Sequence, residues 1–91
     1  MLLVASIAER DTLRYTPAGI PIVSGILQHG SQQTEAGIAR QVEFEIAALA
    51  AGDVSARFAD AELGAVYQFK GFLARKSRNS KALVFHIIEF I

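Results

Sequence analysis

The fold of this chain is decided by residues 40–63, which read RQVEFEIAALAAGDVSARFADAEL. Residues 40–49 alternate between apolar and polar side chains, which predicts a half-buried strand. Residues 54–63 are rich in alanine and fit one or two helical turns, with Asp53 or Ser55 as the N-cap. A strand followed directly by a short helix is the most specific pattern in the chain.

Further strands are predicted on both sides of this segment by runs of apolar and alternating residues. They cover residues 1–7, 20–29, a stretch that begins at Tyr67, and residues 82–91. The polar, glycine-bounded segment 30–37 is expected to be a loop. Three strands, a short helix and two further strands are the order of an oligonucleotide-binding (OB) barrel. We therefore expect an all-β, five-stranded OB-fold barrel with its helix between strands 3 and 4.

Length and composition agree with one small domain. The chain has 91 residues, of which 52% are hydrophobic, so we expect a single OB-fold domain over residues 1–91. It has no cysteine, which excludes disulfides and cysteine nucleophiles and suits a cytoplasmic protein. The apolar segment 1–7 lacks a basic leader and is a poor signal peptide, and no apolar run is long enough for a membrane helix.

Catalytic and metal-binding patterns are missing from the sequence. His29 and His86 both lie inside predicted strands, far apart, without further metal ligands at suitable spacing. Glu43 and Glu45 resemble a carboxylate pair, but without an acid–base partner they are better interpreted as a solvated strand face. No phosphate-binding glycine loop is present. We expect no enzyme activity, no cofactor and no metal.

Charge is distributed unevenly along the chain although the net charge is zero. Residues 35–62 hold six acids and two arginines, whereas residues 63–91 hold five cations and one acid. Four of these cations lie in residues 75–81, RKSRNSK, a predicted hairpin tip without acids. Such a tip can follow a phosphate backbone, or it can be a solvated turn whose lysines protect a strand edge. Composition alone leaves both interpretations open.

Aromatic side chains are the second requirement for binding a single strand, because bases stack on them. Most phenylalanines lie at core-like positions, and the chain has no tryptophan. Tyr15, beside Arg14 at a turn, is the aromatic residue that we expect to be most exposed. Electrostatic contacts should therefore outweigh stacking.

Four short segments carry a resemblance to a known family, in order and spacing, over nearly the whole chain. They are residues 16–21 (TPAGIP), residues 35–41 (EAGIARQ), Gly71-Phe72-Leu73 with the basic tip after it, and residues 88–91 (IEFI). In these segments the chain resembles the PriB family (primosomal replication protein N) of bacterial replication-restart proteins.

The resemblance implies a dimeric OB fold, related to single-stranded DNA-binding protein, that binds single-stranded DNA and contacts the primosomal helicase and other restart proteins. The dimer is expected to use the first strand, which is apolar on both faces. The resemblance implies nucleic-acid contacts by these residues: Arg14, Arg40, Lys76, Arg78 and Lys81. The basic tip adds Arg75, and the expected exposure of Tyr15 adds a stacking contact.

Two positions depart from the family pattern. Ile38 and Glu43 stand where the family has stacking aromatic residues. We therefore expect the basic tip to carry more of the binding in this chain. An alternative is a protein-interaction adaptor that binds the helicase with little or no DNA binding, which Glu43, Glu45 and the zero net charge favour. A third interpretation, a subunit of a larger β assembly, rests on the apolar strand edges alone.

Overall fold

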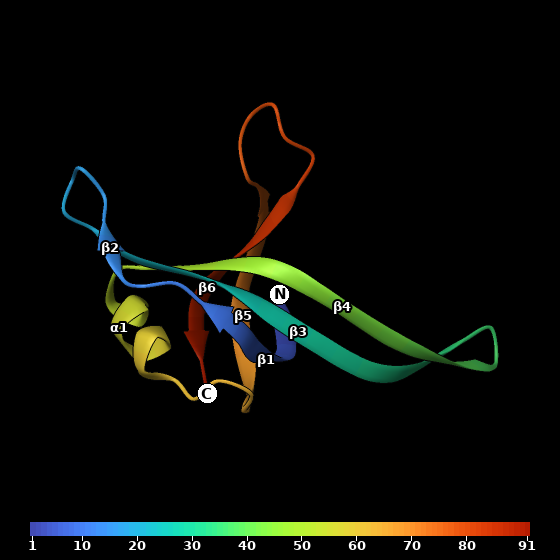
Figure 1. Ribbon diagram of the computed structural model, residues 1–91. Helices are drawn as coiled ribbons and strands as arrows, with labels where there is room; N and C mark the ends of the chain where they lie inside the picture. The colour runs from blue at the N-terminus through green and yellow to red at the C-terminus, as the bar shows by residue number, and fades with distance from the viewer.

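The computed structural model describes residues 1–91 and is mostly β, with one short helix (Figure 1). Its elements are β1 (Leu2–Arg10), β2 (Arg14–Tyr15), β3 (Pro21–Glu35), β4 (Ile38–Ala51), α1 (Asp53–Asp60), β5 (Val66–Arg75) and β6 (Leu83–Phe90). The five long strands close a barrel in the order β1-β5-β6-β4-β3, because β3 also pairs with β1. All pairings are antiparallel except that of β4 with β6. The predicted closed barrel with one short helix is confirmed and is consistent with an OB fold.

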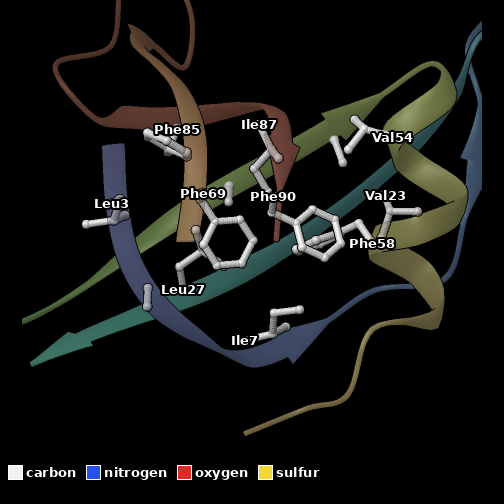
Figure 2. Packing of buried hydrophobic residues seen from close by; sticks show 13 residues of the cluster. Leu3, Ile7, Val23, Leu27, Val54, Phe58, Phe69, Phe85, Ile87 and Phe90 are labelled. Atoms are coloured by element: carbon white, nitrogen blue, oxygen red, sulfur yellow. The ribbon is translucent and has the colours of Figure 1, made fainter. Parts of the chain in front are cut away.

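A core of 13 buried apolar residues fills the barrel, and α1 covers one end of it. The helix directs Phe58, which is fully buried, into edge-to-face contact with Phe69 and Phe90, with ring centroids 6.3 and 6.1 Å away (Figure 2). Arg10 fixes the end of the helix, because its Nη1 donates hydrogen bonds to the carbonyl oxygens of Phe58 and Ala61. No helix in the structure is long and apolar enough to cross a membrane.

The prediction of a loop over residues 30–37 is wrong. β3 and β4 pair without interruption from Ile22 and Ala51 to Glu35 and Ile38, so only two residues form the turn. Those residues, Ala36 and Gly37, have φ angles of 52° and 78°, as a type I′ hairpin turn requires. The polar side chains suggested a loop, but a strand pairs through its backbone and tolerates polar residues on both faces when it leaves the core. The hairpin therefore extends well beyond the barrel (Figure 1).

The first half of β1 has an open edge. Met1 and Gly71 exchange both backbone hydrogen bonds, and pairing with β5 continues to Ser6. Because antiparallel pairs alternate, Leu2 and Val4 direct their backbone groups away from β5. On that side β3 begins to pair only at Ser6. The expectation of a strand that is apolar on its outer face is confirmed, since Leu2 and Val4 are 75% and 50% exposed.

Candidate nucleic-acid interface

A cleft of about 670 Å³ crosses the outer face of β3, β4 and β6. Its floor is made by side chains that alternate along each strand with those of the core: Ser24, Ile26, Ala47, Leu49, Val84 and His86. The parallel pairing of Leu49 with His86 and of Ala47 with Val84 joins β4 to β6 across the floor. The barrel therefore presents a shallow, mixed polar and apolar surface there.

Three of the predicted contact residues line this cleft. Arg14 comes from β2, and Arg75 and Lys76 come from the end of β5 and the start of the following loop. Pairing of β2 with β3 places Arg14 over the floor, where its Nη1 donates a hydrogen bond to Ser24 Oγ at 3.3 Å. The Lys76 N–H donates to the Ala82 carbonyl oxygen at 2.9 Å, which closes the base of the β5–β6 loop. Residues far apart in sequence thus provide cations on both sides of one cleft.

The local charge is less positive than these three cations suggest. Glu9 and Asp11 also line the cleft, at its β1 end. Arg10 lines it too, but its guanidinium already donates to carbonyl oxygens at the end of α1. The positive charge available to a ligand therefore comes mainly from Arg14 and from the β5–β6 loop.

The other predicted cations lie outside the cleft. Arg78 and Lys81 are exposed in the β5–β6 loop, which projects from the barrel, and neither has an ion-pair partner (Figure 1). Arg40 lies near the tip of the β3–β4 hairpin, where it forms an ion pair with Glu35. Ile38 lies beside this tip and is 67% exposed. The structure therefore separates the central cations, which line the cleft, from the peripheral cations outside it. The central cations are Arg14, Arg75 and Lys76, and the peripheral cations are Arg40, Arg78 and Lys81.

The aromatic residues differ from the sequence expectation in two places. Tyr15 is 68% exposed, as predicted, but it does not line the cleft. Phe72 and Phe44, expected among core-like positions, are 50% and 40% exposed. Phe72 shares its strand face with Lys70, so the alternation in β5 already carried the signal that it points outward.

Sequence reasoning also missed His86 as a residue of the site. Its ring lies parallel to that of Phe72, with centroids 4.9 Å apart and an interplanar angle of 3°. His86 also lines the cleft. The cross-strand pair of Phe72 with His86 brings the two rings together, and no pattern within one strand reveals that pairing. No group of three or more His, Cys, Asp or Glu side chains is placed to hold a metal ion.

Comparison with known proteins identifies the family. Residues 1–89 match the family described as "Another single-strand binding protein family". Replication restart protein PriB of Bordetella pertussis is 40% identical over 85 residues, which are 93% of this chain and 79% of that protein. The chain belongs to the PriB family. The resemblance inferred from the sequence is thereby confirmed.

Solved structures agree with this membership. PriB from Ralstonia solanacearum is 48% identical and superimposes with a TM-score of 0.90, covering 100% of this chain and 93% of that one. The single-stranded DNA-binding protein domain of a Synechococcus sp. protein is 17% identical, with a TM-score of 0.74 and coverage of 99% and 90%. That second likeness shows a shared fold.

Proposed function

We propose that this PriB-family chain is a single-stranded DNA-binding accessory protein of replication restart. The observation that carries the proposal is the basic cleft, where Arg14, Arg75 and Lys76 flank a floor of strands in a barrel of the single-strand binding type. A relative is named replication restart protein PriB, which supports a role in the restart primosome. Binding and recruitment of a helicase require no catalytic residues, so the chain acts without enzyme activity of its own.

In this proposal the DNA backbone lies along the cleft and continues onto the loop. Arg14, Arg75 and Lys76 contact phosphates in the cleft, and Arg78 and Lys81 contact them from the exposed loop. Flexible cations of this kind bind phosphates without reading the base sequence. Arg40, at the hairpin tip, contributes a further phosphate contact. Tyr15, beside Arg14, contributes a stacking surface.

We also propose that the protein acts as a cytoplasmic homodimer. The open edge of β1 supports the dimer, because Leu2 and Val4 have exposed apolar side chains and face no neighbouring strand on that side. Of their backbone groups there, the Val4 carbonyl oxygen is contacted by His29 Nδ1 at 2.6 Å. Edge strands of this kind pair readily with a second chain. Two copies bring two basic clefts into one particle. The relatives named as replication proteins support the cytoplasmic location.

A second function, an adaptor that contacts the restart helicase with little DNA binding, has one feature in its favour. Glu43 and Glu45 are exposed on the outer face of β4, the face that also provides the cleft floor. Their carboxylates repel phosphates and would suit a basic protein surface instead. A helicase pull-down without DNA, set beside a DNA titration, separates the two functions.

The proposed function is tested by titrating labelled oligo-dT at several salt concentrations. If about five phosphates are neutralised, the logarithm of the binding constant should fall with the logarithm of salt concentration at a slope of about −3.5. The double variant Lys76→Glu with Lys81→Glu should weaken binding and leave the barrel folded. A slope near zero contradicts the phosphate assignment. Capture of the helicase without measurable DNA binding favours the adaptor.

A further inference from the structure

A second hollow of about 350 Å³ lies beside the basic cleft on the outside of the barrel. Its walls are mainly apolar and include Phe72, Ile87 and Ile88. Leu49 and His86 line both the hollow and the cleft. The two depressions therefore form one continuous surface, which passes from the basic residues over β6 to Phe72.

The rings of Phe72 and His86 form a stacked aromatic pair on this surface. They are stacked 4.9 Å apart at an interplanar angle of 3°, and Phe72 is half exposed. Nothing in the fold requires a large aromatic side chain at this outward position, since Phe72 does not belong to the core. An exposed, parallel aromatic pair beside cations is the arrangement on which nucleobases stack.

Electrostatics disfavour the other route out of the cleft, which runs along the hairpin toward Arg40. Along the outer face of β4, the floor residues Ala47 and Leu49 are followed toward the hairpin by Glu45 and Glu43. A single strand that left the cleft along the hairpin would bring its phosphates next to both carboxylates. A strand that leaves over β6 meets His86 and Phe72, and Asp53 is the one acidic residue that lines the second hollow.

We propose that the stacked pair Phe72–His86 is a platform for a nucleobase of the strand whose phosphates lie on Arg14, Arg75 and Lys76. This inference rests on the proposed DNA binding and adds the residues that hold a base. It supplies a stacking surface in a chain that has Ile38 and Glu43 at the two positions where the family has stacking aromatic residues.

The test compares Phe72→Ala with the wild-type protein by fluorescence anisotropy, on labelled oligo-dT and on an abasic oligonucleotide of equal length. Loss of one stacked base should lower the affinity for oligo-dT by about 5- to 150-fold. The slope against salt should not change, because no phosphate contact is lost. On the abasic strand, Phe72→Ala and wild type should bind equally.

Two further variants keep the test decisive. Leu73→Ala removes an apolar side chain of similar exposure from the same strand, outside both depressions, and should bind as wild type does. Phe72→Trp introduces the chain's only tryptophan, whose fluorescence should be quenched when oligo-dT binds. It also retains an aromatic ring should Phe72→Ala fail to fold.

Distinct outcomes would overturn the platform and the proposed function. The platform is excluded by wild-type affinity in Phe72→Ala, by an equal loss on the abasic strand, or by an unquenched Phe72→Trp. It is also excluded if Phe72→Ala changes only the oligomeric state in light scattering, because the surface then binds a second copy of the chain. Absence of salt-dependent binding by the wild-type protein rejects the DNA-binding function itself, and the platform with it.

Discussion

The backbone of Gly71 lies against the carbonyl group of His86, so that a Cβ atom on residue 71 would overlap the carbonyl oxygen. The pairing of β5 with β6 shifts register next to this glycine, between Lys70 and Gly71. The close approach allows the following residue, Phe72, to stand opposite His86 on the outer surface. The position of the stacked Phe72–His86 pair therefore depends on Gly71, which has no side chain.

Replacing Gly71 by alanine should destabilise the protein. The added methyl group meets backbone atoms, which cannot rotate away, so β5 and β6 must separate locally. We expect a loss of about 1–3 kcal/mol in the free energy of unfolding, measured by urea denaturation. Gly30→Ala is the matched control, since a Cβ there meets no atom within 4 Å and should change stability little. Equal stability of the two variants would show that the strands have room at residue 71.

The turn of the β3–β4 hairpin can be stabilised by a substitution. Ala36 has a φ of 52°, a left-handed conformation that alanine adopts only with strain. Asparagine is preferred at the first position of a type I′ turn followed by glycine, so Ala36→Asn should raise the free energy of unfolding by about 0.5–1 kcal/mol.

Thermal unfolding of Ala36→Asn, followed by circular dichroism, measures this effect. Gly37→Ala is the opposite control: its φ of 78° should make alanine costly, and the melting temperature should fall. If neither substitution changes the melting temperature, the hairpin tip frays in solution and residues 30–37 behave more like the loop that the sequence suggested.

Substitution of Arg75, one of the central cations, tests whether the cleft binds the DNA phosphates. Arg75 lines the cleft, so Arg75→Ala should weaken oligo-dT binding and reduce the salt slope by about 0.7, the contribution of one phosphate on a single strand. Lys70→Ala removes another exposed cation of the same strand, which pairs with Glu89 outside the cleft. It should leave the slope unchanged. Equal reductions in both variants would mean that overall charge, and not the cleft, determines binding.

The open edge of β1 predicts the effect of charge on assembly. Val4→Lys places a cation on the outer face of this edge, where desolvating it opposes strand pairing, so the protein should become monomeric. Sedimentation velocity measures the change. Leu63→Lys, at an exposed position outside the strands, should keep the wild-type oligomeric state. A Val4→Lys protein that remains dimeric would place the interface elsewhere.

The sequence by itself determined the elements that depend on local patterns. Alternation in residues 40–49 and the alanine-rich stretch after them correctly predict a strand followed by a short helix. The family segments, such as residues 16–21, identify the PriB family, which the comparisons confirm. The cluster of cations in residues 75–81 can be recognised from the sequence, because the charge of a side chain does not depend on its neighbours in the fold.

Only the tertiary structure decided which of these residues share a surface. The pairing of β2, β3, β4, β6 and β5 across the sheet brings Arg14 and Arg75 to one cleft. The pairing of β5 with β6 stacks Phe72 on His86, whereas Arg40 is left at a distant hairpin tip. The pairing of β3 with β4 turned residues 30–35 from an expected loop into strand. The physical reason is that alternation along one strand reports which face a side chain occupies, while its neighbours on that face depend on backbone hydrogen bonds to segments far away in sequence.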